Sequence, residues 1–470
     1  MIKLKKTKKG LIIPLVLVFG TLFLLLMAGL MSFVHLQLEQ SRKQVAQDSA
    51  LKIAEAGINY YKWCLTNEIE DHCEGEKDYY DNEGNLVGSY SINVQVEKHC
   101  DQPSETTIIA TGWTKDRPET KRKIEVLYAK TSVGIYSYLI NDNVWAGSDR
   151  EVRGHYHSNG GIRMDGENKS LVTSAKNEWI CTDSFGCDFC PSECREENGD
   201  CYCPGVFSTS DNSKTDLFDY PASSFDFNGI TMNLAEIKSL SQNEGGHYFP
   251  PVKNINSNGE GYHLVFKKDG TFDLYIVTDT NSTYSYNNEI GWHYDYFEID
   301  SEYIYGNFSI ASACSLVFIE DRLWVEGEVN GKITIAAANL EDPNKDENVI
   351  LLGDIEYFSE EENGLALIGQ NNILISPASP DIMEIKGIFL AQKGRFGRNH
   401  YPFNTREKLE IYGSIISNGR VGTQWTSGGH VISGYMKREN YFDSNLVYKP
   451  PPFVPRASNE FKIINWKEVK

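Results

Sequence analysis

Residues 3–34 read KLKKTKKGLIIPLVLVFGTLFLLLMAGLMSFV, and this stretch decides how the rest of the chain is interpreted. Lysines stand at positions 3, 5, 6, 8 and 9, and the 24 residues Leu11–Val34 contain no charged side chain. Since a helix rises about 1.5 Å per residue, this run is long enough to cross a hydrocarbon core of about 30 Å. A basic segment before the first span favours a cytoplasmic N-terminus. We therefore predict a single-pass membrane protein whose bulk is extracytoplasmic.

The segment after the apolar run favours a long helix over a cleaved signal peptide. Residues 35–65 contain no proline, and their first glycine is Gly57. Apolar and small residues recur at spacings of mostly three and four, as on one face of a helix: Leu36, Leu38, Val45, Ala46, Ser49, Ile53, Ala56 and Tyr60. We predict one helix from Leu11 to Leu65, of which half lies in lipid and half projects from it.

The basic leader ending at Gly10, the apolar helix and the segment ALKIAEAG at residues 50–57 together carry a resemblance. They are similar to the start of PilX-like minor pilins of type IV pilus systems. The resemblance implies cleavage between Gly10 and Leu11, and other pilin subunits as partners of the N-terminal helix beside the membrane. One departure is Leu15, at a position where most pilins carry glutamate. A permanent anchor with a helical stalk is the alternative.

Charge and composition limit the class of protein. The chain has 65 acidic and 45 basic side chains and a net charge of −20. No basic patch follows the leader, so we expect no nucleic-acid partner. With 39 glycines, 26 tyrosines and recurrent Asp-Gly and Asn-Gly turns, most of the 470 residues should be β-structure.

The ten cysteines of the chain lie outside the predicted membrane segment, where disulfides are expected. Six of them cluster between residues 181 and 203, and Cys314 stands alone. The disulfide candidates are Cys64, Cys73, Cys100, Cys181, Cys187, Cys190, Cys194, Cys201 and Cys203. The spacing in the cluster also suits zinc, and six cysteines allow 15 pairings, so the connectivity stays open.

The order of patterns along the chain predicts four parts. Residues 1–65 form the leader, transmembrane helix and stalk, and residues 66–130 a small antiparallel sheet with strands at 89–96, 106–113 and 121–128. Residues 131–455 form a head, and residues 456–470 a C-terminal tail that lies along the surface. The head has a Cys-rich insertion at 177–204 and a helical insertion at 227–245, and residues 261–278 predict a hairpin that turns at 268–271.

Short apolar runs separated by Gly or Asn recur in the head about every 20 to 25 residues. This texture predicts a right-handed parallel β-helix, a mainly β fold in which each coil buries its side chains against the next. A β-sandwich is the alternative. Segments such as 157–160, 365–373 and 441–455 are similar to the exported halves of PilX-like proteins, so the resemblance covers most of the chain.

Three groups of side chains are candidates for chemistry in the head. His155 and His157 lie two apart, with Asp165 nearby in sequence, which suits a metal only if a third ligand exists. Paired carboxylates of the kind that lyases and hydrolases use are sought among Asp295, Glu298 and Asp300, and among Glu360, Glu361 and Glu362. An aromatic run could stack on sugars: Tyr284, Tyr286, Trp292, Tyr294, Tyr296 and Phe297.

None of these groups forms a recognisable catalytic motif, so we predict no catalytic, cofactor-binding or metal-binding residue. The predicted function is a non-enzymatic minor pilin-like protein at the cell surface or on a pilus. Its head is too large to repeat along a packed shaft, so we expect a place at the tip, in assembly initiation or in adhesion to glycans or a partner surface. The alternative is a membrane-anchored β-helix lyase or hydrolase that acts on surface polysaccharide.

Overall fold

The computed structural model describes residues 12–469, apart from 68, 70–72, 100, 101, 231, 232, 244, 311–314 and 343. These residues form two compact units. The N-terminal unit comprises residues 1–96, 106–128 and 463–470, and the head comprises residues 97–105 and 129–462. Gly10, Leu11, Cys100 and Cys314 lie outside the described residues.

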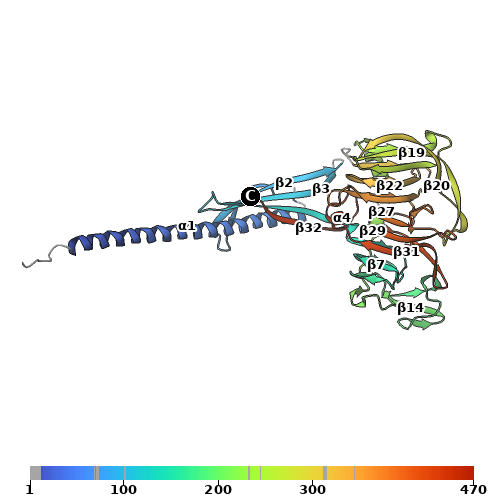
Figure 1. The fold of residues 1–470 in the computed structure, drawn as a ribbon, viewed down its shortest axis with the longest axis horizontal. Coiled ribbons are helices and arrows are strands. Elements are labelled where there is room, and N and C mark those ends of the chain that lie inside the picture. Colours follow the sequence, from blue (N-terminus) through green and yellow to red (C-terminus); the bar gives the residue numbers. More distant parts are fainter. Residues whose placement is uncertain are drawn as a thin grey trace, which may run out of the picture. The chain divides into compact units, whose positions relative to one another are not determined.

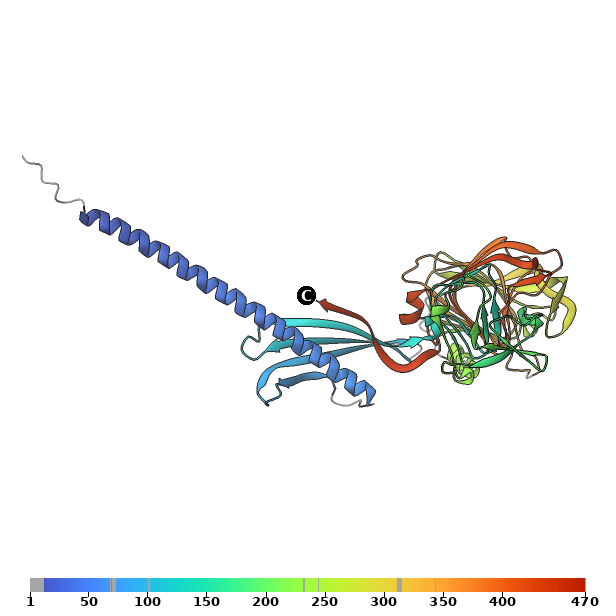
Figure 2. The same cartoon turned by 90° about the horizontal axis from the view of Figure 1, so that it is seen from below.

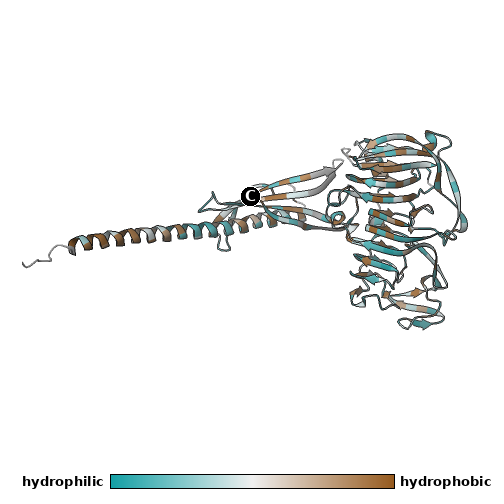
Figure 3. Cartoon of the chain, viewed as in Figure 1, coloured by the Kyte–Doolittle hydropathy of each residue, from teal (hydrophilic) through white to brown (hydrophobic). Residues whose placement is uncertain are grey.

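The N-terminal unit begins with helix α1, Ile12–Thr66, which agrees with the predicted helix (Figures 1 and 3). Its apolar first half is long enough to cross a membrane and is exposed within this chain. Its second half buries Ala46, Ala50, Ile53, Ala54 and Ile58. Leu36, Leu38 and Val45 of the predicted apolar face are exposed within this chain, because no sheet covers that part of the helix.

A five-stranded sheet packs on this buried face, in the order β1-β2-β3-β4-β32. The strands are β1 Gly75–Tyr80, β2 Leu86–His99, β3 Gln102–Thr114, β4 Lys121–Ser132 and β32 Arg456–Val469. The expected surface tail at 456–470 is wrong, because its residues continue the sheet beside β4. Lys467 pairs with Glu125 at 2.6 Å, and Arg122 pairs with Glu468.

Glycine explains how closely sheet and helix approach in this unit. A Cβ atom at Gly112 would lie 2.3 Å from the Ala50 carbonyl oxygen and 2.4 Å from the Ala54 nitrogen. At Gly57, an added Cβ would meet the ring of Tyr90 at 3.0 Å. The small residues of the ALKIAEAG segment therefore form the contact surface of the helix.

The head is a stack of short strands that pair in parallel, in three ladders of hydrogen bonds (Figures 1 and 2). Its strands are β5 Tyr136–Ile140, β6 Val144–Ala146, β7 Arg150–Arg153, β8 His155–Ser158, β9 Ile162–Met164, β10 Glu167–Asn168, β11 Val172–Ser174, β15 Val206–Phe207, β16 Phe218–Asp219, β17 His247–Phe249, β18 Gly261–Lys267, β21 Leu316–Ile319, β22 Leu323–Val329, β23 Lys332–Ala337, β24 Val349–Tyr357, β25 Gly364–Gly369, β26 Ile373–Ile375, β27 Ile382–Ala391, β28 Phe396–Gly397, β29 Thr405–Ser417, β30 Gln424–Ser427 and β31 His430–Tyr441. Steps without a long insertion vary from 16 residues (Tyr156 to Val172) to 32 residues (Thr334 to Ala366). Steps that contain an insertion are longer, at 46 residues from Val172 to Phe218 and 70 residues from His247 to Val317.

The order of strands in the stack differs from their order in the chain. The first ladder runs β17-β21-β23-β25-β27-β29-β5-β8-β11-β16. The chain therefore enters the stack in its middle at β5, runs to one end, restarts at the opposite end with β17 and returns to the middle. There β29 pairs with β5 and β31 pairs with β7; we call this contact the join.

The interior of the stack is apolar over most of its length, and one outer face is also covered. Leu323, Val349, Ile373 and Phe396 occupy successive strands and are fully buried. The outer face of the first ladder is covered by α3 (Leu234–Asn243) and by a C-terminal segment that includes α4 (Ser444–Tyr448). Helix α2 is Phe227–Ile230, and Asn233 caps α3 by accepting a hydrogen bond from the Glu236 N–H at 3.3 Å.

Glutamates are aligned on another outer face of the stack. Glu384, Glu410, Glu439, Glu151 and Glu167 stand opposite one another in successive strands. Aligned like charges are destabilising unless they are neutralised. Bases on or next to the same strands pair with them, including Lys408 with Glu439 at 2.9 Å and Lys169 with Glu151 at 2.6 Å.

The aligned glutamates and their basic partners predict that the head is sensitive to acid. Burial alone would raise the pKa of Glu439, but hydrogen bonds from Lys437, Tyr441 and Lys408 lower it from 4.5 to about 2. Since the folded pKa is the lower one, the stabilisation is present above pH 4.5 and is lost as the pH falls toward 2. We expect the unfolding midpoint to fall across this window. A Glu439→Gln variant should be less stable at neutral pH and should show a flatter profile; identical profiles would contradict the assignment.

Candidate functional site: an aromatic surface on the β19–β20 hairpin

A long hairpin lies between β18 and β21 in the chain. Its strands, β19 Thr271–Asn287 and β20 Gly291–Ser309, pair antiparallel, so that Tyr284 faces Tyr294 and Tyr286 faces Trp292. The hairpin predicted over residues 261–278, with its turn at 268–271, is confirmed. Strand β18 pairs antiparallel with β19 up to the pair Lys267 and Thr271. Strand geometry places alternate side chains on opposite faces of the hairpin.

One face of this hairpin carries exposed aromatic rings. Tyr284, Trp292, Tyr294 and Tyr296 are between 46% and 58% exposed. Tyr284 stacks on Trp292 with the ring centroids 4.8 Å apart, and Tyr294 lies 5.2 Å from Tyr284. We call Tyr284, Tyr286, Trp292, Tyr294 and Tyr296 the aromatic surface. Contiguous exposed rings of this kind are typical of binding sites, whereas single exposed apolar residues are not.

The aromatic surface continues onto the stack. The ring of His400 lies 5.5 Å from Trp292, and Trp425 lies 5.6 Å from Tyr286 and 5.9 Å from His400. Tyr286 and His400 also exchange two backbone hydrogen bonds of 2.9 Å. The tip of the hairpin is therefore fastened to the stack, and the rings are held on a rigid base.

Phe403 adds a further exposed ring close in sequence to His400. Its side chain is fully exposed, and its backbone has a φ of 58°, in the left-handed region that large residues avoid. Sequence reasoning missed His400 and Trp425, because nothing in their local pattern places them beside the hairpin.

The opposite face of the hairpin is a buried polar cluster. Asp295 accepts hydrogen bonds from the Asn399 side chain at 2.8 Å and from the Tyr401 hydroxyl at 2.9 Å. Burial and the neighbouring Asp295 carboxylate raise the pKa of Tyr401, so its hydroxyl remains a proton donor. Phe297, the sixth aromatic residue of the predicted run, is buried on this face.

The cluster contains a serine, a histidine and an aspartate, which are the residue types of a hydrolase triad. They are not arranged as a triad requires. Ser285 Oγ and Asp295 Oδ1 both contact His293 Nε2, at 3.1 and 3.0 Å. The other ring nitrogen, Nδ1, faces the Gly291 carbonyl at 2.8 Å. A triad needs the nucleophile and the carboxylate on opposite ring nitrogens, and Ser285 is fully buried. These contacts lie within the hairpin, and the hydrogen bonds from Asn399 and Tyr401 to Asp295 hold the hairpin against the stack.

The two predicted carboxylate groups do not converge in the described part of the chain. Asp295 points inward, while Glu298 and Asp300 accept hydrogen bonds from Thr283 and Asn281. In the second group, Glu360 pairs with Lys386, and residues 361 and 362 are exposed. Neither group provides the acid and base pair that glycosidic cleavage requires.

The predicted histidine pair shares one hydroxyl. His155 Nε2 and His157 Nδ1 lie 3.0 and 2.7 Å from Thr173 Oγ1. Burial, followed by the proximity of His157, lowers the pKa of His155 to about 4. Asp165, which lies nearby in sequence, is bound elsewhere: it accepts hydrogen bonds from Arg163 at 2.7 Å and Trp145 at 2.8 Å.

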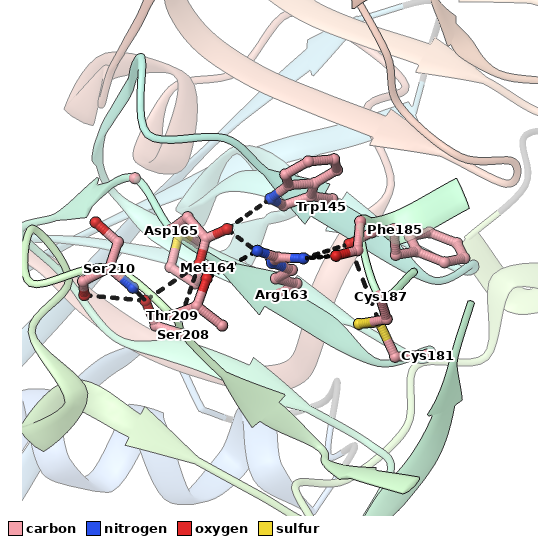
Figure 4. Close-up of polar contacts among 12 residues, drawn as sticks. Trp145, Arg163, Met164, Asp165, Cys181, Phe185, Cys187, Ser208, Thr209 and Ser210 are labelled. Carbon is pink, nitrogen blue, oxygen red and sulfur yellow. Dashed lines mark hydrogen bonds and ion pairs between the residues drawn. A yellow bond between two sulfur atoms is a disulfide. The ribbon is translucent and has the colours of Figure 1, made fainter. Parts of the chain in front are cut away.

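Arg163 and Asp165 instead anchor the Cys-rich insertion to the stack (Figure 4). The Arg163 guanidinium stacks over Trp145 at 4.6 Å and donates to the carbonyls of Phe185 and Gly186 at 2.9 and 2.7 Å. Both charged side chains are buried and mutually paired, which limits the cost of burying them. The insertion is thereby held in a defined orientation on the head.

The insertion itself is a three-stranded antiparallel sheet cross-linked by disulfides. Its strands are β12 Glu178–Cys181, β13 Arg195–Glu197 and β14 Asp200–Pro204. The structure pairs Cys181 with Cys187, Cys190 with Cys201 and Cys194 with Cys203, and in the N-terminal unit Cys64 with Cys73. Sulfurs of the insertion lie close enough to hold a metal, but as disulfides they offer no thiolate to zinc.

No protein-family model and no curated protein matches this chain. Among solved structures, it is similar to the competence-associated pilin ComZ from Thermus thermophilus. The match has 13% sequence identity and a TM-score of 0.29, and it covers 90% of this chain and 98% of that chain.

Proposed function

We propose that this chain is a non-enzymatic, pilin-like component of a type IV pilus system that displays its head for adhesion to glycans. The observation that carries the adhesive part is the aromatic surface, because stacked rings on a rigid base match the apolar faces of sugar rings. The pilin-like part rests on the apolar helix, on the antiparallel sheet packed against its second half and on the resemblance in residues 1–57.

We infer that the stacked strands of the head form a right-handed parallel β-helix. Three parallel ladders with repeated steps along the chain support this inference, as do asparagines that hydrogen bond from coil to coil. Asn159 donates to Asn141 at 2.8 Å, and Asn141 donates to Asn418 at 2.9 Å across the join. Crossovers between parallel strands are right-handed in nearly all proteins. Such a rod would carry the aromatic surface as a stiff support.

A pilin-like role predicts processing of the leader. We expect the native membrane protein to begin at Leu11, because a prepilin peptidase cleaves after the glycine that ends the basic leader. Mass spectrometry of the N-terminal peptide checks this. If Met1 or Ile2 were retained, the protein would be a permanent surface anchor, and the adhesive function of the head would stand alone.

The adhesive role predicts a loss of binding when rings are removed. Substitution of both Trp292 and Tyr294 by alanine should weaken glycan binding at least about tenfold, since each lost ring at the centre of a site costs about 1–2 kcal/mol. The measurement is titration of the full-length chain, in a sugar-free detergent, against a panel of polysaccharides.

The matched control is Phe189→Ala, which removes a ring of the insertion that is 90% exposed and lies outside the aromatic surface. Its binding should equal that of the unmodified chain. Equal binding by the double variant would contradict the assignment of the site. Release of sugars from any polysaccharide would contradict the non-enzymatic role and favour the lyase or hydrolase alternative.

A further inference from the structure

We propose that the aromatic surface selects polysaccharides whose sugars carry free, protonated amino groups. The proposal rests on the proposed adhesive function and adds the chemical class of the ligand. It is carried by the charge of the hairpin and by the placement of that charge beside the rings.

The hairpin is acidic throughout. Residues 271–309 contain no lysine and no arginine, although these make up 45 of the 470 residues of the chain. The same segment contains seven carboxylates: Asp273, Asp279, Glu289, Asp295, Glu298, Asp300 and Glu302. An anionic polysaccharide would be repelled by this surface, and a cationic one would be attracted.

Some of these carboxylates already have basic partners in the head. Asp273 pairs with Lys267 at 3.3 Å, Glu302 with His263 at 2.9 Å and Glu289 with Arg395 at 3.7 Å, while Asp295 is buried against His293.

Three carboxylates remain without a cationic partner among the described residues: Asp279, Glu298 and Asp300. Their hydrogen bonds come from neutral groups, namely the Thr280 N–H, the Thr283 hydroxyl and the Asn281 amide. They can therefore pair with a charged ligand without first breaking an ion pair.

The unpaired carboxylates follow the rings along the hairpin. On β20, Glu298 and Asp300 come directly after the exposed rings in sequence. The register shifts between the pairs Thr283–Asp295 and Asn281–Glu298, so an irregularity in the strand pairing separates the rings from the carboxylates. Since two residues of a regular strand advance about 6.8 Å, the stretch from Trp292 to Asp300 is at most about 27 Å long. A linear chain of several sugars can stack on the rings at one end while its amines reach the carboxylates at the other.

The rings themselves favour cations. The faces of Trp and Tyr carry negative potential and attract ammonium groups. Of two guanidinium groups near the rings, Arg395 pairs with Glu289. Arg322 keeps its positive charge, and it donates to the Tyr296 carbonyl at 3.4 Å and lies over the Trp324 ring at 5.6 Å. N-acetylation or a uronic acid would remove or reverse the charge that this surface complements.

The test compares three hexasaccharides by calorimetric titration of the full-length chain in a polyoxyethylene detergent: glucosamine, N-acetylglucosamine and galacturonic acid. We expect the glucosamine hexamer to bind at least tenfold more tightly than the acetylated one, and the uronic acid hexamer not to bind. Raising the salt concentration from 50 to 300 mM should reduce this preference, because exposed charges are screened.

Variants separate charge selectivity from ring stacking. Glu298→Gln with Asp300→Asn should abolish the preference and leave binding of the acetylated hexamer unchanged, whereas the Trp292 and Tyr294 double variant should lose both ligands. The matched charge control is Glu361→Gln with Glu362→Gln, which should keep the preference.

Equal or tighter binding of the acetylated hexamer would overturn the proposed selectivity and leave the adhesive function standing. Binding of no saccharide, here or in the broader panel, would overturn both. A preference that survives in the Glu298 and Asp300 variant would overturn the assignment of these two carboxylates.

Discussion

Replacing Asp149 by asparagine is expected to destabilise the head by about 3 kcal/mol, because it removes the counter-charge of a buried arginine. Asp149 holds Arg438 with two hydrogen bonds, of 2.7 and 2.6 Å, across 289 residues of sequence. Burial lowers the pKa of the Arg438 guanidinium, and the neighbouring Arg150 guanidinium lowers it further. Without Asp149, two buried guanidinium groups would face one another at the join.

The measurement is unfolding in urea followed by tryptophan fluorescence; of the eight tryptophans, Trp145, Trp179, Trp292, Trp324 and Trp425 belong to the head. The matched control is Asp381→Asn. Asp381 also pairs with an arginine, Arg406, at 3.0 Å, but its side chain is 72% exposed. An exposed pair contributes at most about 1 kcal/mol, so this variant should unfold almost as the unmodified chain does. Equal losses in the two variants would show that the join does not depend on the buried pair.

Replacing Gly112 by alanine is expected to destabilise the N-terminal unit by about 3 kcal/mol. The added methyl group would lie 2.3 Å from the Ala50 carbonyl oxygen, where no backbone can accommodate it without movement. Overpacking of this kind forces neighbouring elements apart. The separation would expose the face of the sheet that includes Ile108, Ala110, Ile124 and Val126, all of which are fully buried.

Hydrogen exchange of the amides of β3 and β4, measured by mass spectrometry, distinguishes this local loss from unfolding of the head. We expect faster exchange in these strands and unchanged exchange in the stack. Gly422→Ala is the control, since an added Cβ at Gly422 meets no atom within 4 Å. Unchanged exchange in the Gly112 variant would mean that helix and sheet are not as closely packed as the structure has them.

Features that depend on local chemistry were predictable from the sequence. The helix up to Thr66 follows from its apolar run and from the absence of helix breakers. The turn between β18 and β19 follows from Asp269-Gly270, since Gly270 has a positive φ of 79°. Alternation along the first part of β20 places Trp292 and Tyr294 outward and Asp295 inward.

The remaining features were decided by tertiary structure. Strand β5 lies between β29 and β8, and the strand β32 pairs beside β4. Nothing in the sequence of these segments indicates which strand each one pairs with. His400 and Trp425 lie beside the aromatic surface although they are distant in sequence from the hairpin. The physical reason is that period, charge and turn residues act within a few positions. The edges of strands, by contrast, present the same N–H and C=O groups whatever the sequence, so only the packing of the whole chain selects which edges meet.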